Sequence, residues 1–178
     1  GRIDAFFLGG GQIDGEANIN LVGSGEYPRV DVRWPGSFGS AYLYFLVPRV
    51  ILFREEHTPR VFVKKVDFVS APGTSPPGIY RPGGPWKLVT GLGLFEFDRS
   101  RKRFILESVH PGHTVEEIVV NTGFDFDRPD RVPTTPAPEP RVLALIRGRI
   151  RDEIAALAPL EFVQKHPEVR ELDLNPVF

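Results

Sequence analysis

The stretch Phe6-Phe7-Leu8-Gly9-Gly10-Gly11-Gln12-Ile13-Asp14 decides the fold class. A short apolar run that leads directly into glycines is typical of a buried strand followed by a tight turn. Open α/β sheets bind their ligands at that edge, because backbone without side chains can approach the ligand closely. The stretch therefore predicts an α/β protein with a candidate binding site at Gly9 and Gly10. A plain tight turn explains the same glycines equally well.

The glycine segment does not match a nucleotide-binding fingerprint. No G-x-G-x-x-G is completed before Gly15, and the Lys-Ser/Thr ending of a P-loop is missing. The segment therefore indicates neither a dinucleotide site nor a P-loop.

Further short runs rich in β-branched and aromatic residues predict the other strands of the sheet. The last two such runs are joined by a short polar segment, which predicts an antiparallel hairpin and hence a mixed sheet. The runs are Ala5–Leu8, Val50–Phe53, Val61–Val63 with Val66–Val69, Trp86–Thr90, Leu92–Phe97 and Phe104–Val109.

Two segments in the second half of the chain predict helices. Thr114 with Glu117 three residues later forms a capping box, which predicts a short helix from there. Apolar residues at helical spacing predict a second helix over 141–158, with three arginines on its solvated face. The apolar residues are Val142, Leu143, Ile146, Ile150, Ile154 and Leu157, and the arginines are Arg147, Arg149 and Arg151.

Five prolines between 129 and 140 predict an extended connector, because proline interrupts both helices and sheet ladders. The chain is therefore expected to have three parts. These are an α/β domain over 1–128, the Pro-rich connector over 129–140 and a C-terminal helical appendage over 141–178.

Composition excludes several classes of protein. The 22 basic and 23 acidic residues are dispersed without a basic stripe, which argues against nucleic-acid binding. The longest apolar run, Ala41–Val47, is far shorter than the ~18 residues that span a bilayer. The absence of cysteine excludes disulfides, thiolate metal sites and thiol nucleophiles. We expect a cytoplasmic protein without a membrane or nucleic-acid partner. Because the sequence has no methionine, we also expect coding sequence before Gly1.

Polar and small residues near the glycine segment are further candidates for a site. Asn18 and Asn20 alternate on an extended segment, so both carboxamides could line one wall and donate hydrogen bonds to an oxyanion. Ordinary turn asparagines explain the pair about as well. The loop Pro35-Gly36-Ser37-Phe38-Gly39-Ser40 could form an anion-binding nest at a helix N-terminus. That signal is weak when taken alone.

The histidines and carboxylates give no clear catalytic pattern. His110 and His113 have an i, i+3 spacing, but the intervening Pro111 and Gly112 favour a turn over a metal site. No G-x-S-x-G elbow supports a serine triad. We therefore expect no metal and no permanently bound cofactor.

Taken in order, these blocks resemble the B (beta) subunit of family I CoA-transferases. The resemblance is to the glutaconate CoA-transferase-like branch, which includes steroid-ring-cleaving CoA hydrolases, and it covers roughly residues 1–126. The matching blocks are Leu8–Asp14, Asn18–Asn20, Pro35–Ser37, Arg60–Val63 through Val66–Ser70, Val89–Phe97, Ser108–Gly112 and Thr122–Phe124.

The resemblance implies a Rossmann-like domain with a mostly parallel sheet, which pairs with a homologous A (alpha) subunit in a hetero-oligomer. The substrate would be a coenzyme A thioester bound between the subunits. In such transferases a glutamate attacks the thioester, and amides of small-residue loops stabilise the oxyanion. By position, Gln12 and Asn20 are the catalytic candidates. The candidates for substrate or CoA binding are Gly9, Gly10, Asn18, Gly36 and Gly39.

The chain departs from the family pattern at three places. In the second loop, Pro35–Ser40, Phe38 stands where relatives have a glycine, and its side chain could narrow the loop. Ala17 stands where relatives have a glycine before the first asparagine. The segment that carries the nucleophilic glutamate would lie before Gly1.

Three hypotheses follow from the sequence. The leading one is the B-type subunit of a CoA-transferase acting on acyl-CoA thioesters and carboxylic acids. The others are the beta subunit of a CoA-ester ring-cleaving hydrolase and a non-catalytic subunit that keeps the fold for assembly or binding.

Overall fold

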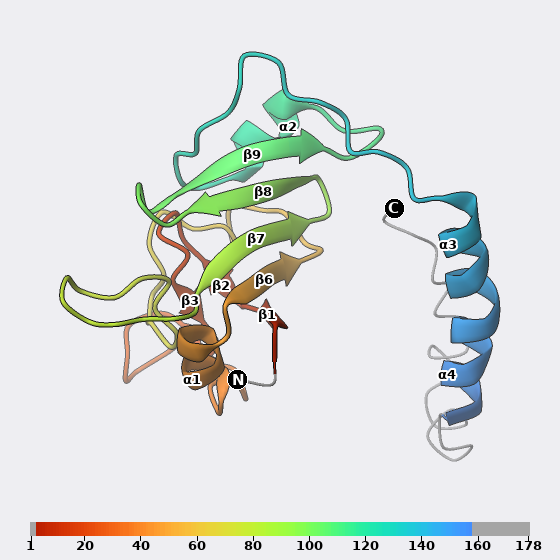
Figure 1. The fold of residues 1–178 in the computed structure, drawn as a ribbon. Coiled ribbons are helices and arrows are strands. Elements are labelled where there is room, and N and C mark those ends of the chain that lie inside the picture. The colour runs from red at the N-terminus through yellow and green to blue at the C-terminus, as the bar shows by residue number, and fades with distance from the viewer. Residues whose placement is uncertain (1–2, 158–178) are drawn as a thin grey trace. The chain divides into compact units, whose positions relative to one another are not determined.

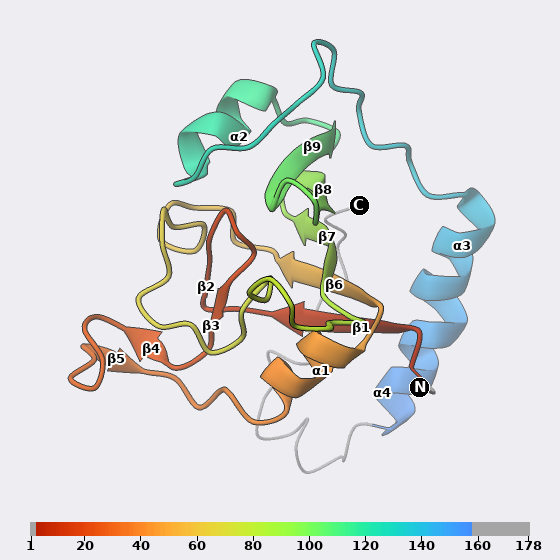
Figure 2. The same ribbon diagram turned by 60° about the vertical axis from the view of Figure 1, so that its left-hand side comes forward.

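The computed structural model describes residues 3–157 (Figures 1 and 2). The chain divides into two compact units, Gly1–Thr135 and Pro136–Phe178. The boundary lies within the Pro-rich segment.

A five-stranded sheet with the order β1-β6-β7-β8-β9 forms the centre of the first unit. β1 is parallel to β6 and β6 to β7, whereas β8 is antiparallel to both of its neighbours. Every strand except β8 therefore points in the same direction, which confirms the predicted mixed, mostly parallel sheet. The strands are β1 (Ala5–Gly9), β6 (Arg49–Arg54), β7 (Pro85–Thr90), β8 (Gly93–Asp98) and β9 (Arg103–Val109).

One face of this sheet is covered mainly by short or irregular elements. The hairpin of β2 (Gln12–Ile13) and β3 (Ile19–Asn20) and the helix α2 (Val115–Asn121) lie on this face (Figure 1). Three further elements complete the unit: β4 (Gly23–Ser24), β5 (Val32–Arg33) and α1 (Ser40–Leu46). The β4–β5 hairpin lies away from the five-stranded sheet (Figure 2).

The core lies between the sheet and this covering layer. The sheet contributes Val50, Leu52, Leu88, Phe95, Phe104 and Leu106, and the layer contributes Ile13, Ile19, Phe62 and Ile118. Aromatic rings meet edge-on in its centre, as for Phe95 with Phe104 at 6.2 Å and 73°. Such edge-to-face pairs add to the stabilisation that apolar burial provides.

The prediction of strands at 61–63 and 66–69 is wrong. This segment is irregular apart from a single parallel bridge between Ile13 and Phe62. Three of its apolar residues are nevertheless buried, since Val61, Phe62 and Val66 are at most 4% exposed, whereas Val69 is 44% exposed. The β-branched residues correctly predicted a segment that is partly buried. The segment, however, crosses over the sheet instead of joining it.

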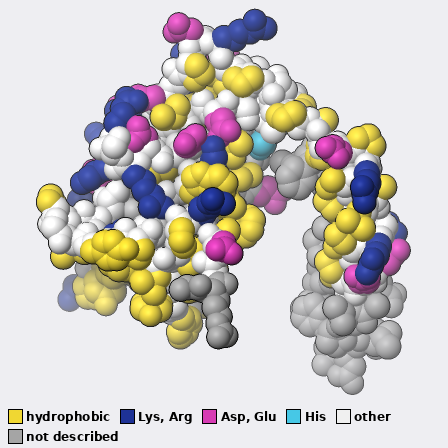
Figure 3. Space-filling view, in the orientation of Figure 1, with side chains coloured by type: hydrophobic (Ala, Val, Ile, Leu, Met, Phe, Trp, Pro, Cys, Tyr) yellow, Lys and Arg dark blue, Asp and Glu magenta, His cyan; other side chains and the backbone are white. Residues whose placement is uncertain are grey.

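The opposite face of the sheet is open among the described residues of the first unit. Phe7 and Phe53 on neighbouring strands are 62% and 47% exposed. In Figure 3, drawn from this side, hydrophobic side chains gather beside a group of charged ones. Strands in parallel sheets are usually covered on both faces.

The helix predictions agree with the structure. Thr114 caps α2 by accepting a hydrogen bond from the Glu117 amide at 3.1 Å. In the second unit a continuous helical stretch runs from α3 (Pro140–Leu145) through a π-helical turn (Ile146–Ile150) to α4 (Arg151–Leu157). Its apolar stripe is partly exposed from Val142 to Ile154. The expected appendage beyond 157 lies outside the described residues.

One expectation about the connector needs correction. Although it is rich in proline, its first half pairs with the edge of the sheet: the Val109 amide donates to the Pro133 carbonyl, and the Thr135 amide donates to the Val109 carbonyl. Proline lacks an amide hydrogen but keeps its carbonyl, so it can still accept a hydrogen bond from an edge strand.

Gly123 should be intolerant of a side chain. A Cβ there would lie 2.5 Å from the Phe62 carbonyl oxygen, which the Gly123 amide already contacts at 2.7 Å. We expect Gly123→Ala to lower the free energy of unfolding by about 2 kcal/mol, because backbone must move apart. Gly39→Ala is the matched control, since nothing lies within 4 Å of its Cβ position. Urea denaturation measures both variants, and equal stabilities would contradict the packing described.

Candidate functional site

The carboxyl ends of the parallel strands meet at one edge of the sheet. β1 ends at Gly9, β6 at Arg54 and β7 at Thr90. The glycines after β1 are closely packed: a Cβ on Gly10 would lie 2.9 Å from Ile19, and one on Gly11 would lie 2.3 Å from the Trp34 ring. The turn therefore needs glycine for close packing, whether or not a ligand approaches it.

The structure brings Gln12 and Asn20 together as directly bonded neighbours on β2 and β3. Asn20 is completely buried, and its Nδ2 donates at 2.7 Å to Gln12 Oε1 and to the Gly23 carbonyl. Its Oδ1 accepts from the Val22 amide at 2.9 Å. Gln12 Nε2 donates to Asp67 Oδ2 at 2.9 Å. Both carboxamides are thus engaged in hydrogen bonds within the protein.

Asn18 belongs to a second set of contacts, at the tip of the β2–β3 hairpin. Its Nδ2 and its amide donate to the two carboxylate oxygens of Asp14, and its Oδ1 accepts from the Gly73 amide at 3.1 Å. Asp14 is 4% exposed and also accepts from the Glu16 amide. Asn18 and Asn20 therefore do not form one shared wall. They anchor opposite ends of the hairpin.

The second loop lies beside the first. A Cβ on Gly36 would lie 2.6 Å from the Leu21 carbonyl, directly after β3, while Gly39 precedes the seven-residue helix α1 and has open space around it. Phe38 is 93% exposed. Its ring therefore does not fill the loop, contrary to the expected narrowing.

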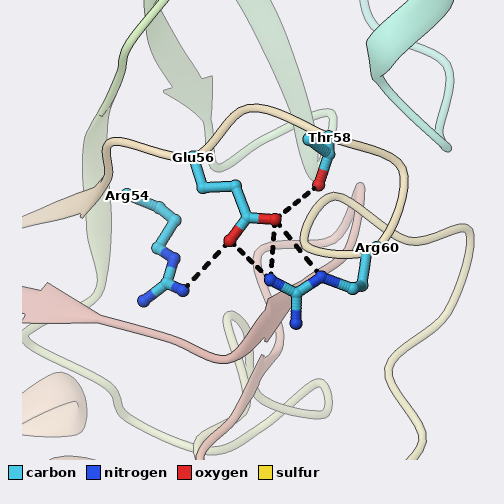
Figure 4. Close-up of polar contacts among 4 residues, drawn as sticks. All are labelled: Arg54, Glu56, Thr58 and Arg60. Carbon is cyan, nitrogen blue, oxygen red and sulfur yellow. Dashed lines mark hydrogen bonds and ion pairs between the residues drawn. The ribbon is translucent and has the colours of Figure 1, made fainter.

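Sequence reasoning missed a charged cluster directly after β6 (Figure 4). Arg60 donates from Nη2 to both carboxylate oxygens of Glu56 at 2.7 Å, Arg54 donates at 3.3 Å and Thr58 at 3.0 Å. The hydrogen bond from Arg60 is the largest cause that lowers the pKa of Glu56. Glu56 and Arg60 are four residues apart, but their segment is not helical, so this spacing did not reveal the cluster. A carboxylate held in this way is a weak nucleophile.

Two histidines converge on Thr90 at the end of β7. The Thr122 hydroxyl donates to the Ile118 carbonyl, so it accepts from His57 Nε2 at 2.9 Å. The Thr90 hydroxyl lies 2.8 Å from His57 Nδ1 and 3.1 Å from the Gly93 carbonyl, and its single proton serves one of these two acceptors at a time. Desolvation lowers the pKa of His57 to about 4, so the ring is neutral at pH 7.

His110 completes this network from the other side. Its Nε2 donates to the Thr90 carbonyl at 3.0 Å, and its Nδ1 accepts from the Thr135 hydroxyl at 2.9 Å. Partial burial lowers its pKa. His113 instead contacts Glu117 at 3.0 Å. The two histidines of the His-Pro-Gly-His segment thus have separate partners, and residues 3–157 contain no cluster of three potential metal ligands.

Comparison with known proteins places this arrangement in a family. The profile of the family "Coenzyme A transferase" matches residues 1–121. The chain belongs to the coenzyme A transferase family. The family match spans the whole five-stranded sheet, the carboxyl edge and the helix α2.

Individual relatives agree with the family assignment. The chain is 36% identical over 151 residues to the B subunit of glutaconate CoA-transferase from Acidaminococcus fermentans, covering 81% of this chain and 56% of the relative. It is 35% identical over 155 residues to the B subunit of 3-oxoadipate CoA-transferase from Pseudomonas knackmussii, covering 83% and 59%. The chain thus spans less than two thirds of the length of these relatives.

Solved structures show the same likeness. The glutaconate coenzyme A-transferase of A. fermentans superposes with a TM-score of 0.71 at 34% identity, covering 81% of this chain and 57% of that chain. The Rhodococcus jostii IpdAB structure superposes with a TM-score of 0.75 at 29% identity, covering 81% and 59%. The resemblance inferred from sequence blocks is therefore confirmed at the level of the family and the fold. Within residues 3–157, every helix is too short or too polar to cross a membrane.

Stability should depend on pH through His57. Its pKa is about 4 in the folded protein, against an ordinary value of 6.5, so the unfolded chain binds the proton first as pH falls. The contribution of His57 is complete above pH 6.5, and we expect about 3 kcal/mol of it to be lost by pH 4. His57→Gln should flatten this part of the profile, measured by urea denaturation between pH 4 and 7. His113→Gln is the control, and equal slopes in wild type and His57→Gln would contradict the assignment.

Replacing the carboxamide of Asn20 with a carboxylate should destabilise the fold. In Asn20→Asp the oxygen that replaces Nδ2 would face the oxygens of Gln12 and Gly23 at 2.7 Å without a proton between them. We expect a loss of at least about 2 kcal/mol at pH 7 and a smaller loss at pH 4, where a proton can restore one hydrogen bond. Denaturation at both pH values measures this effect. Asn121→Asp is a control, because its side chain is only partly buried and donates a single bond to Glu117. An equal loss at both pH values would show that Asn20 is not held as described.

Proposed function

We propose that the chain is the B-type subunit of a two-subunit, cytoplasmic CoA-transferase that acts on acyl-CoA thioesters and carboxylic acids. The observation that carries the proposal is the family match over 1–121, which includes the glycine turn at the carboxyl edge of the parallel strands. The two relatives of highest identity given above are named as B subunits of transferases for glutaconate and 3-oxoadipate. We propose a carboxylic acid as the CoA acceptor, without choosing among acids.

In this proposal the described part of the chain contributes loops to the site. Gly9 and Gly10 contact the thioester on one side, and Gly36 and Gly39 belong to the loop on its other side. Acyl transfer creates an oxyanion, which backbone amides stabilise most effectively when they are held rigidly. We propose that Gln12 and Asn20 provide that rigidity. Their carboxamides are bonded to Asp67 and Gly23, so they act as positioning residues for the amides around them.

Asn18 has the corresponding role at the far end of the hairpin. It ties Asp14 to Gly73, and a Cβ on Gly73 would lie 2.1 Å from the Glu16 carbonyl. The hairpin is thus held at both ends. We propose that this rigidity, and not contact with substrate, is what Asn18 contributes.

A homologous A subunit is the proposed partner in a hetero-oligomer. The open sheet face with Phe7 and Phe53 is the kind of apolar surface that subunit interfaces bury. Lys87 on this face pairs with both Glu96 and Glu107. Although partial burial alone lowers the pKa of Lys87, the bonds from the two glutamates raise it. The trio carries a net negative charge, so a partner covering it should present a cation there.

The beta subunit of a CoA-ester ring-cleaving hydrolase is the second candidate function. The chain is 31% identical over 144 residues to the cholesterol ring-cleaving hydrolase IpdB subunit of R. jostii, covering 79% of this chain. In such a hydrolase the reactant that attacks the CoA ester substrate would be water, whereas in a transferase it is a carboxylate. A non-catalytic assembly subunit is the third reading, and it is favoured by the internal bonding of Gln12 and Asn20.

Kinetics of the assembled enzyme distinguish these functions. The chain, co-expressed with its neighbouring gene product, should exchange CoA between acids across an acyl-CoA panel with ping-pong kinetics. Water-dependent cleavage of a ring in a cyclic acyl-CoA, with the thioester retained and no exchange of CoA, would indicate the ring-cleaving hydrolase. No turnover and no CoA binding by the intact pair would exclude both enzymes.

Two Gly→Ala variants of the assembled enzyme, one in the second loop and one outside it, test whether that loop contacts the acyl-CoA. Gly39→Ala should raise KM for the acyl-CoA about tenfold, because a Cβ obstructs the approach of substrate while the fold has space for it. Gly148→Ala in the second unit also meets no atom within 4 Å and should leave KM unchanged. Equal KM values in the two variants would remove Gly39 from the site.

A further inference from the structure

The helix α1 presents large apolar side chains to solvent. Phe38, just before the helix, is 93% exposed, and Tyr42 and Leu46 follow at intervals of four residues with exposures of 69% and 38%. Side chains four residues apart lie on the same face of a helix. The helical hydrogen bonds begin beside Phe38, since the Leu43 amide donates to the Gly39 carbonyl at 3.0 Å. Tyr42 and Leu46 therefore share one face and Phe38 lies at its start; we call these three residues the α1 stripe.

The composition of α1 is unusual for a helix with an exposed face. The seven residues Ser40–Leu46 include neither an acidic nor a basic side chain. Helix α2 has the same length and carries Glu116 and Glu117 in its first turn. A surface helix has charged and polar residues opposite its core contacts, whereas a helix that is apolar all round is buried. The composition of α1 is thus that of a helix covered on both sides by protein.

The inward face of α1 is firmly anchored. Tyr44 is completely buried, its hydroxyl donates to the Ala17 carbonyl at 2.8 Å, and the Arg81 guanidinium lies 5.1 Å from the centre of its ring. Arg81 also donates to the Tyr44 carbonyl at 3.0 Å. Tyr42 and Leu46 are each two residues from Tyr44, which turns them by about 200° around the helix axis. The α1 stripe is therefore held facing outward, so a partner would bind a preformed surface.

The position of the α1 stripe relates it to the proposed site. Phe38 belongs to the same loop as Gly36 and Gly39, and this loop is proposed to contact the thioester. A second subunit that shares the substrate site has to approach this loop. The helix also lies against β1, the edge strand that carries the exposed Phe7. The α1 stripe thus lies beside the surface that the proposed function assigns to the A subunit.

We propose that the α1 stripe is a docking surface for the A subunit, and that Phe38 and Tyr42 enter an apolar recess of that subunit. Aromatic side chains are enriched in the buried centres of protein interfaces, where a few of them supply most of the affinity. The recess should carry no charge opposite the two rings, because a buried charge without a partner is costly. This assignment rests on the proposed function, since the A subunit is the partner, and it adds which helix binds and what chemistry binds it.

Association of the chain with its co-expressed neighbouring gene product tests the proposal. The double variant Phe38→Ser/Tyr42→Ser should raise the Kd of the pair at least about tenfold, measured by mass photometry over a dilution series. Both side chains are exposed in the chain alone, so the variant should keep the unfolding temperature of the wild-type chain. Weaker association then cannot result from lost folding.

The double variant Val119→Ser/Val120→Ser is the matched control. These valines are 48% and 76% exposed on α2, which has the length of α1, and they lie outside the α1 stripe and the proposed site. The control should associate with the A subunit as the wild type does. Equal Kd values for Phe38→Ser/Tyr42→Ser and the wild type, or an equal loss in both double variants, would overturn the docking surface and leave the CoA-transferase function standing.

The same measurements identify a failure of the proposed function itself. If the wild-type chain does not associate with its neighbouring gene product, the two-subunit function is wrong, and the A subunit is lost as the partner of the α1 stripe. If the chain alone forms dimers that Phe38→Ser/Tyr42→Ser dissociates, the stripe binds a second copy of the chain. That result would overturn the assignment to the A subunit.

Discussion

The fold depends on the backbone hydrogen bonds that hold an irregular layer over the sheet. Ile13 exchanges bonds with Val61 and Val63, and Ile19 exchanges bonds with Ser70 and Ala71. Buried backbone groups must find partners, and in this layer no long helix supplies them. Ile13 and Ile19 are fully buried between these bonds and the sheet. If the bonds were lost, the core would lose its cover, so the hairpin has to be held in one position.

The polar side chains of the candidate site serve the same layer. Gln12, Asn20 and Asp67 join the hairpin to the segment that follows Phe62, while Asp14 and Asn18 secure its tip. Carboxamides suit this position because each supplies both donors and acceptors. The same groups that stabilise the core therefore also fix the backbone near the carboxyl edge. In this layer, stability and the placement of the backbone have a common physical origin.

The sequence predicted the elements whose signals are local. Runs of apolar residues between turn formers located β1 and β6 to β9, and a capping box located α2, since each signal lies within the element itself. The segment 61–69 was misread because burial and strand formation produce the same apolar pattern. Two-residue strands such as β2 carry too little pattern to detect. The grouping of Asn20 with Gln12 and Asp67 depends on contacts between distant segments, which spacing along one chain does not reveal.

The histidine network shows how the two kinds of information combine. His110 stood out in the sequence through its neighbours, whereas His57 did not, yet both bind Thr90 at the end of β7. The hydroxyl and the carbonyl of Thr90 thus contact both rings, and the hydroxyl also accepts from the Gly93 amide in the turn before β8. His57 in turn contacts Thr122 at the end of α2. A neutral His57 suits this role, because the ring is desolvated and burial disfavours its charged form. The end of β7 is therefore rigid for a structural reason, and the carboxyl edge of the sheet is rigid as a result.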